Sequence, residues 1–572
     1  MTYFEKYQRW LAEPSVTDAE KEELRAIAKD EKEIEFRFSG ALSFGTGGLR
    51  GIMKVGLNAM NTHTVAHATQ GLSNLILGEG RARDGVAVAH DCRINSRLFA
   101  ETAARVLAAN GIKVYLFDEL RPTPELSFTL RELGCVAGIN ITASHNPKQY
   151  NGYKAYWEDG GQLPPEHADI VAAEIAKLDV FRDVKFVDLE AAKASGLITV
   201  IGREMDEKYL AAVTAQAVNP SAIANVADDL KIVYTPLHGT GCRLVPEILR
   251  RVGVKHLYTV PEQMVIDGNF PTVEKPNPEY PAVFKLGIEL ANREGSDLII
   301  ATDPDADRVG VMTRTKDGSF RTITGNQMGA LLLDYIITAY KKTGSMPPEP
   351  YAVKSIVSTE LASRICEANG VEMHNVLTGF KFIGEVIKKH EEEGRGTFLF
   401  GFEESYGYLK GTYARDKDAV VASMLIAEMT AYYYAAGMTL SDALDALFAR
   451  YGFCYETTVE IYMEGLDGAA RMAALMDGMR ANPLAELAGN RVTAVSDYLK
   501  QTITENGTTR PTGMSRSNVL SYRLENGDLI VARPSGTEPK IKFYYLLRGK
   551  NEAETKQKAD LYKAALNQIA GI

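Results

Sequence analysis

A strand–turn–helix–glycine–strand pattern occurs three times in this chain and constrains its fold more than any other feature. Each copy starts with a short apolar run, passes through a polar turn into an amphipathic stretch, and reaches a glycine before a second apolar run. Glycine at that position suits the end of a helix. The copies span residues 85–117, 231–260 and 351–376, with Gly111, Gly253 and Gly370 in equivalent places. Repetition at long spacing predicts three related α/β domains, each built on a βαβ unit.

The two ends of the chain read differently. Residues 21–38 are rich in Glu, Lys and Leu and predict a helix, which Thr17 or Asp18 can cap. After Leu440 we expect helical material to about Ala485, followed by alternating strands with a hairpin signal at Asn526-Gly527. The C-terminal part therefore predicts an α+β domain with an antiparallel sheet.

The length of 572 residues fits this count of domains, because about 150 residues per domain gives roughly four. From the changes in pattern we place the domains at residues 1–205, 206–322, 323–438 and 439–572.

Composition excludes several classes of protein. The apolar fraction of 45% and charged fraction of 24% are those of a globular protein, and no apolar run reaches the length of a membrane span. The net charge of −10 argues against a broad nucleic-acid surface, so an anionic ligand needs a local basic pocket. The five cysteines are scattered without a zinc or disulfide pattern, and no export signal is present, so we expect a cytoplasmic protein without membrane or nucleic-acid partners.

The stretch TASHNP, residues 142–147, is the first candidate for chemistry. It follows an apolar run at residues 136–141, so a turn at the strand end can expose the hydroxyl of Ser144. A serine is a weak nucleophile, and as a phosphoryl carrier it needs a metal, anion-binding groups and a proton acceptor from other segments.

The stretch DPDADR, residues 303–308, supplies the metal ligands. It follows an apolar strand, and its alternating carboxylates at Asp303, Asp305 and Asp307 can turn toward one point. Hard oxygen ligands at this spacing suit Mg²⁺. A calcium-binding EF-hand would need glycine and glutamate where this chain has Arg308 and Arg314, so that alternative fails.

Three further stretches can bind a sugar phosphate or transfer a proton. In RPSGTEP, Arg533 offers a planar fork, and Ser535, Gly536 and Thr537 offer hydroxyls and backbone N–H groups for a phosphate dianion. GFEESYG, residues 401–407, places acids past a strand. Lys417 stands close to Arg415, whose charge can lower a lysine pKa toward a proton-transfer role.

Taken together, these stretches resemble the α-D-phosphohexomutase family across nearly the whole chain. TASHNP looks like that family's phosphoserine loop, DPDADR its metal loop, GFEESYG its sugar loop and RPSGTEP its phosphate loop, in the family's order. The resemblance implies three similar mixed-sheet α/β domains and a smaller α+β domain around a central cleft. In chain order they are the phosphoserine, metal-binding, sugar-binding and phosphate-binding domains.

The resemblance also implies roles for individual residues. Ser144 is phosphorylated in the active enzyme, and one Mg²⁺ per chain is held by the phosphoserine with Asp303, Asp305 and Asp307. Arg50 and Arg308 line the transfer site, and Lys417 is the first candidate for the proton acceptor, with His145 and Lys154 behind it. The sugar is contacted by Thr378, Gly379, Glu403 and Ser405.

The implied reaction interconverts glucose 1-phosphate and glucose 6-phosphate, with glucose 1,6-bisphosphate as intermediate and activator. Phe380 stands where typical phosphoglucomutases have tryptophan, which keeps a phosphopentomutase as an alternative. A phosphomannomutase is a weaker alternative, because the histidine of its sugar loop is missing here. A hydrolase using the same serine and metal and a silent sugar-phosphate sensor are the remaining classes. The expected partners are small sugar phosphates, and the protein is expected to be a monomer or homodimer.

Overall fold

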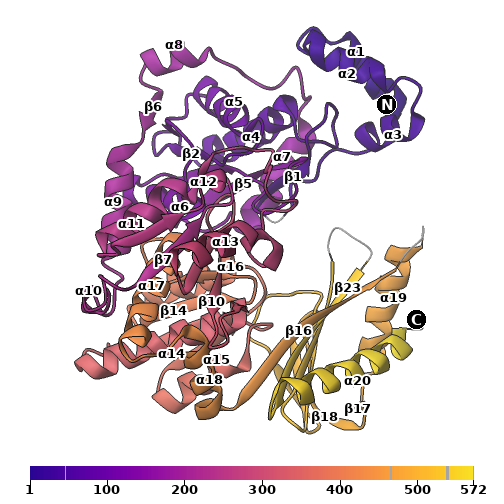
Figure 1. Ribbon diagram of the computed structural model, residues 1–572. Helices are drawn as coiled ribbons and strands as arrows, with labels where there is room; N and C mark the ends of the chain where they lie inside the picture. Colours follow the sequence, from indigo (N-terminus) through magenta and orange to yellow (C-terminus); the bar gives the residue numbers. More distant parts are fainter. Residues whose placement is uncertain (46, 464–466, 536–539, 571–572) are drawn as a thin grey trace. The chain divides into compact units, whose positions relative to one another are not determined.

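The computed structural model describes residues 1–45, 47–463, 467–535 and 540–570 (Figure 1). The chain forms two compact units, and each is described by itself. The first comprises Met1–Ile323, Gly384–Glu393 and Gly407–Thr439, and the second comprises Thr324–Ile383, Gly394–Tyr406 and Leu440–Ile572.

The first domain is a mixed sheet in the order β1-β5-β4-β2-β3-β6, with helices on both faces. Its apolar core joins one face of this sheet to α4, α5 and α7, while α6 packs on the other face. The strands are β1 (Gly48–Ile52), β2 (Val86–His90), β3 (Val114–Phe117), β4 (Ala137–Ile141), β5 (Tyr150–Trp157) and β6 (Ile198–Ile201); the helices are α4 (Thr62–Gly78), α5 (Ser96–Ala109), α6 (Thr123–Leu133), α7 (Pro165–Lys177) and α8 (Leu189–Ala194).

The N-terminal region contains three short helices rather than one long helix over residues 21–38. They are α1 (Tyr3–Ala12), α2 (Asp18–Ala26) and α3 (Glu31–Phe38). Thr17 caps α2, as expected. The single-helix prediction is wrong because the side chain of Asp30 accepts the N–H of Glu33 and starts a new helix there.

The second domain is a mixed sheet in the order β11-β10-β9-β7-β8, with α13 packed on its apolar core. On its other side α11 packs against α9 and α17. The strands are β7 (Lys231–Thr235), β8 (His256–Thr259), β9 (Leu298–Thr302), β10 (Val309–Arg314) and β11 (Phe320–Ile323); the helices are α9 (Arg203–Thr214), α10 (Ser221–Ala224), α11 (Gly241–Arg251), α12 (Pro261–Met264), η1 (Pro281–Phe284) and α13 (Lys285–Glu294). The first unit also contains a segment from later in the chain, with the short strand β15 (Gly407–Leu409) and the helix α17 (Ala419–Ala435).

The second unit contains most of the third α/β domain and the C-terminal domain. In the third domain, β12 pairs in parallel with both β13 and β14. Its elements are α14 (Gly325–Thr343), β12 (Pro350–Ser355), α15 (Glu360–Asn369), β13 (Glu372–Val376), β14 (Thr397–Glu403) and α18 (Leu440–Tyr451); α16 (Phe380–Glu393) begins in the second unit and ends in the first.

The C-terminal domain is an antiparallel sheet in the order β16-β23-β22-β21-β18-β19-β20, with β17 paired to β18. Figure 1 shows α20 running across this sheet, and α19 and α20 share its apolar core. The other face packs on the third domain through Ile356, Leu377 and Tyr544. The elements are β16 (Phe453–Tyr462), α19 (Gly468–Ala481), β17 (Glu486–Leu487), β18 (Asn490–Asp497), β19 (Thr502–Glu505), β20 (Thr508–Pro511), β21 (Leu520–Leu524), β22 (Leu529–Pro534), β23 (Lys540–Gly549) and α20 (Glu552–Ala570).

The predicted repeat is confirmed in all three places. The strand pairs β2/β3, β7/β8 and β12/β13 are parallel, and a helix connects each pair. Gly111, Gly253 and Gly370 all have positive φ angles, as a helix-ending glycine requires. The fold class, three α/β domains and a C-terminal domain, is therefore as expected.

Within the C-terminal domain one prediction holds and one is wrong. Asn526 and Gly527 form the turn between the antiparallel strands β21 and β22, as expected. The expectation of helical material from Leu440 to about Ala485 holds for α18 and α19 and is wrong for residues 453–462, which form β16 and pair along the whole strand with β23. Among the described residues no single helix meets the length and hydropathy of a membrane span; α17 and α18 do so only as a broken pair.

Candidate active site

Ser144 lies at the centre of the candidate site in the first unit. It follows β4 in a left-handed backbone conformation, with φ of 50°, and its N–H donates to Thr142 Oγ1 at 2.9 Å. Its hydroxyl donates to Asp303 Oδ2 at 2.9 Å and lies 3.1 Å from His145 Nδ1. The left-handed turn carries the hydroxyl out of the strand and toward the aspartates of the second domain.

Arg93 holds this loop in place, a role that the sequence did not suggest. Its buried guanidinium donates to the carbonyl oxygens of Ser144 and Asn146, both at 2.5 Å, and of Pro147 and Tyr150, both at 3.0 Å. A planar fork of five N–H donors can serve these four carbonyls, whereas an ammonium has only three donors. The only sequence signal is that Arg93 ends the polar turn after the first strand of a repeat.

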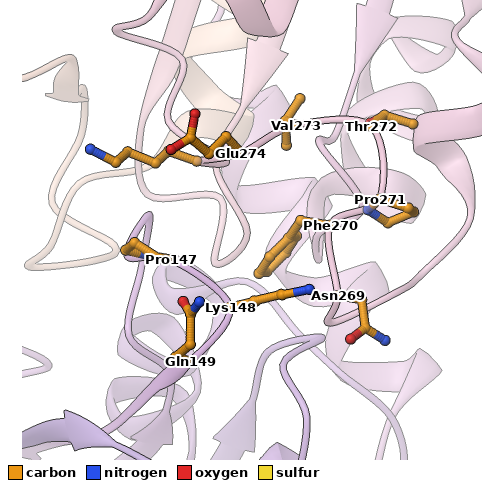
Figure 2. A pocket seen from close by; sticks show the side chains of 10 residues that line it. Pro147, Lys148, Gln149, Asn269, Phe270, Pro271, Thr272, Val273 and Glu274 are labelled. Carbon is orange, nitrogen blue, oxygen red and sulfur yellow. The ribbon is translucent and has the colours of Figure 1, made fainter.

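A loop of the second domain covers this arginine. The ring centroid of Phe270 lies 5.1 Å from the guanidinium carbon of Arg93, and Phe270 is buried. Figure 2 shows Phe270 beside Pro147 and above Lys148 and Gln149. A cavity of about 600 Å³ lies there, lined by Pro147, Lys148, Gln149 and the segment Asn269–Lys275. The loop that carries Ser144 is thus in contact with residues of both domains.

We expect Arg93→Lys to lower the kcat of the phosphoryl transfer expected at Ser144 by about 10²-fold, because a displacement of the serine hydroxyl by about 1 Å is enough to slow a reaction by that factor. Far-UV circular dichroism should stay unchanged. The matched control is Arg105→Lys, since Arg105 also donates to a backbone carbonyl, that of Val187, and lies against Phe186, away from the loop. Wild-type kcat in Arg93→Lys would contradict the role of Arg93, as would an equal loss in the control.

The three aspartates of the DPDADR loop converge as the spacing predicted. Asp303, Asp305 and Asp307 lie between β9 and β10, are buried, and offer oxygen atoms within 4.8 Å of one another. The Oδ1 atom of Asp303 accepts the N–H groups of Asp307 and Arg308, at 3.1 and 3.0 Å, which closes the loop on itself.

The donor set fits a hard divalent cation. The Oδ1 atoms of Asp305 and Asp307 are buried and make no hydrogen bond with the part of the chain that the structure describes, while Asp303 Oδ2 faces Ser144 Oγ. Buried carboxylate oxygens without a hydrogen-bond donor are costly unless a positive charge faces them. Burial and the two neighbouring carboxylates raise the pKa of Asp303 well above its usual range. A cation with oxygen ligands would relieve this repulsion.

Two lysines neutralise part of this negative charge. Lys154 Nζ, on β5, lies 2.7 Å from Asp305 Oδ2 and 3.3 Å from Asp307 Oδ2. Lys417 Nζ, just before α17, lies 3.2 Å from Asp307 Oδ2 and 2.9 Å from Asp416 Oδ1. Burial opposes the charge on Lys154, but the charges of Asp305 and Asp307 outweigh it and raise its pKa.

The guanidinium of Arg415, whose charge was expected to act on Lys417, pairs with Glu391 and donates to the carbonyl of Thr412. Lys417 instead lies between two carboxylates.

Arg50, Arg308 and His145 complete the groups around Ser144. Arg50 Nη1 donates to Asn146 Oδ1 at 3.3 Å, within the phosphoserine loop. Arg308 Nη1 lies 2.9 Å from Glu279, and its Nε lies 3.7 Å from Asp307 Oδ1. Burial, together with the charges of Arg308 and Arg50, lowers the pKa of His145 well below its usual value, so its imidazole is neutral at pH 7.

The predicted sugar and phosphate residues lie in the second unit. Thr378 and Gly379 precede α16, and the N–H of Gly379 donates to Glu403 Oε1 at 2.7 Å, at the end of β14. Ser405 follows two residues later. The side chain of Glu403 therefore links the end of β14 to the segment that contains Thr378 and Gly379.

The predicted phosphate loop joins β22 and β23. Arg533 lies in β22 and hydrogen-bonds Tyr544, whose pKa is raised to about 12 by burial and by Glu404. The N–H of Ser535 donates to the carbonyl of Lys540 at 2.8 Å. Gly536 and Thr537 lie outside the described residues.

Three family models match the chain in order. The models for phosphoglucomutase/phosphomannomutase α/β/α domains I, II and III match residues 41–181, 207–318 and 324–451. Together they cover more than half of the chain.

Individual phosphoglucomutases are also similar to this chain over more than nine tenths of its length. A phosphoglucomutase of Staphylococcus saprophyticus is 37% identical over 533 residues, which are 92% of this chain and 94% of that protein. A phosphoglucomutase of Staphylococcus aureus is 36% identical over 536 residues, 93% and 94% of the two chains. The open form of parafusin, an exocytosis-sensitive phosphoprotein (phosphoglucomutase) of Paramecium, has the same fold, with a TM-score of 0.70 at 17% identity over 93% of this chain and 95% of its own.

Proposed function

Because the chain belongs to the phosphoglucomutase/phosphomannomutase family, we propose that it is a phosphoglucomutase interconverting glucose 1-phosphate and glucose 6-phosphate. The observation that carries the proposal is the 37% identity to a phosphoglucomutase over 92% of the chain. The geometry around Ser144 supports the reaction type, since a serine hydroxyl lies 2.9 Å from one of three convergent aspartates.

In the proposed reaction, phosphoserine 144 donates its phosphoryl group to the free hydroxyl of the sugar phosphate. The bond from phosphorus to Ser144 Oγ breaks as the bond to the sugar oxygen forms, giving glucose 1,6-bisphosphate. The hydroxyl proton goes to Lys417 or to the neutral imidazole of His145; Lys154 is the weaker candidate, because its pKa is raised by Asp305 and Asp307 and its ammonium already carries the proton. The bisphosphate then turns end for end and returns its other phosphoryl group to Ser144.

The residues of the first unit have separate roles in this scheme. Asp303, Asp305 and Asp307, together with the phosphoserine, would hold one Mg²⁺, which offsets the charge of the transferred phosphoryl group. Arg50 and Arg308 add further positive charge beside the loop, as a phosphoserine with about −1.5 to −2 charges requires. Arg93 keeps Ser144 aligned.

The residues of the second unit are assigned to recognition. Thr378, Gly379, Glu403 and Ser405 are proposed to bind sugar hydroxyls. Arg533, Ser535, Gly536 and Thr537 are proposed to grip the phosphate that is not being transferred. Glucose 1,6-bisphosphate is proposed as the activator that phosphorylates Ser144. We further propose that the protein acts in the cytoplasm as a monomer or homodimer; its five cysteines are free.

Phe380 supports a second candidate, a phosphopentomutase, because typical phosphoglucomutases have tryptophan at this position. Phe380 is buried at the start of α16, directly after Thr378 and Gly379, two of the residues proposed to bind the sugar. Mannose phosphate is the third substrate to test, given the family's name.

We expect glucose 1-phosphate to be turned over with a kcat/KM at least about 10-fold above those of ribose 1-phosphate and mannose 1-phosphate, the scale of discrimination that a few pocket contacts give. All three are compared in Mg²⁺ with the matching bisphosphate added. A preference for ribose 1-phosphate would replace the proposed substrate by a pentose. Steady release of inorganic phosphate would indicate a hydrolase, and binding without turnover a sensor.

A further inference from the structure

Thr123 connects the first domain to the aspartate loop of the second domain. It is the first residue of α6 and is fully buried. Its N–H donates to the carbonyl oxygen of Asp305 at 2.9 Å, and its hydroxyl donates to Asp305 Oδ2, also at 2.9 Å. One residue therefore holds both the backbone and the side chain of Asp305.

A second hydrogen bond fixes the direction of the Thr123 hydroxyl. Asn140 Nδ2, on β4, donates to Thr123 Oγ1 at 2.7 Å. A hydroxyl has one proton to donate, and with a donor already on its oxygen the proton is free for the Asp305 carboxylate. Asn140 lies four residues before Ser144, so this chain of bonds joins the strand that carries the serine to the metal loop.

The consequence is that the two oxygens of Asp305 are in different environments. Oδ2 accepts from Thr123 and from Lys154, at 2.9 and 2.7 Å, whereas Oδ1 is buried and accepts no hydrogen bond from the described residues. Rotation of the carboxylate would break both bonds to Oδ2. Thr123 therefore helps to fix the orientation of the carboxylate and leaves Oδ1 as the oxygen available to a cation.

The backbone around Thr123 is restricted, so its hydroxyl can hold the Asp305 carboxylate in one orientation. Pro122 and Pro124 flank it and restrict its backbone. The preceding Arg121 is buried, donates its N–H to the carbonyl of His90 at 3.1 Å, and pairs with Asp206 at 2.6 Å.

We propose that Thr123, oriented by Asn140, is a positioning residue that sets the metal affinity of Asp305. This inference rests on the proposed metal-dependent function, and Thr123 and Asn140 are not among the residues proposed to bind the metal or the sugar phosphate. Partners of this kind typically change metal affinity by about 10- to 100-fold when they are removed.

The test compares Mn²⁺ binding by the full-length protein and two variants, without sugar phosphate, by titration followed with electron paramagnetic resonance. Thr123→Val keeps the shape and removes the hydroxyl, and we expect its Kd for Mn²⁺ to rise by about 10-fold or more. Thr123→Ser restores the hydroxyl and should return the Kd to within about twofold of wild type.

The matched control is Thr129→Val, a buried threonine of the same helix whose hydroxyl bonds only the carbonyl of Glu125, at 2.7 Å, among the described contacts. Its Mn²⁺ affinity should equal that of wild type. Wild-type affinity in Thr123→Val would overturn the inference, as would an equal loss in Thr129→Val or no recovery in Thr123→Ser.

Different results would contradict the proposed function and the proposed role of Thr123. A wild-type protein that binds Mn²⁺ but isomerises no sugar phosphate would remove the proposed function and leave the effect of Thr123 on affinity measurable. An active wild type with unchanged affinity in Thr123→Val would remove the inference alone.

Discussion

Ser144→Ala is expected to lower kcat for glucose 1-phosphate by at least about 10⁴-fold, because the variant has no oxygen that can carry the phosphoryl group. The metal site should survive, since Asp303 keeps its bonds from the N–H groups of Asp307 and Arg308. Mn²⁺ binding therefore serves as evidence that the variant is folded. The measurement is a coupled assay of glucose 6-phosphate formation in the presence of glucose 1,6-bisphosphate.

The control for this variant is Ser73→Ala, a buried serine of α4 in the same domain whose hydroxyl donates to the carbonyl of Thr69. It should keep kcat within about twofold of wild type, as substitutions away from a site usually do. More than a tenth of wild-type activity in Ser144→Ala would mean that the phosphoryl group passes through another residue.

Asp307→Asn is expected to have the second largest effect, lowering kcat by about 10³-fold, which corresponds to the several kcal/mol of charge stabilisation that a bound metal gives. Asp307 is buried, and its carboxylate faces both Lys154 and Lys417. Its loss removes one proposed ligand and leaves two buried lysines with fewer negative partners. The Kd for Mn²⁺ should rise in parallel with the loss of kcat.

Asp228→Asn is the control, because Asp228 lies on the surface of the same domain, paired with Lys255. A surface ion pair contributes at most about 1 kcal/mol to the free energy of unfolding, so the variant should stay folded and keep its activity and metal affinity. If Asp307→Asn kept wild-type affinity for Mn²⁺, the aspartate cluster would not be the metal site.

The α/β domains were predictable because their signals are local. Each repeat combines an apolar strand, an amphipathic helix and a glycine within about 30 residues, the length of a βαβ unit. The strand β16 was missed because its stability comes from pairing with β23, about 90 residues away. Its residues, FCYETTVEIY, are rich in aromatic and β-branched types, a strand signal that the expectation of helical material did not take into account.

The residues of the candidate site also fall into those that the local sequence predicts and those that it does not. Ser144 and the three aspartates stand in short stretches whose chemistry is visible in the residue order. Arg93 and Thr123 were missed because their partners lie in other segments: Arg93 bonds the carbonyl of Ser144, and Thr123 bonds Asp305. No local pattern marks an arginine that serves four carbonyls or a threonine that orients a carboxylate.

The proposed transfer through Ser144 is tested most directly with glucose 1,6-bisphosphate labelled with ³²P. After incubation with the enzyme in Mg²⁺, label should appear in the peptide that contains Ser144, and unlabelled glucose 1-phosphate should then chase it into sugar phosphate at the rate of turnover. Turnover of glucose 1-phosphate with no label on Ser144, or with label on a different residue, would contradict the phosphoserine mechanism.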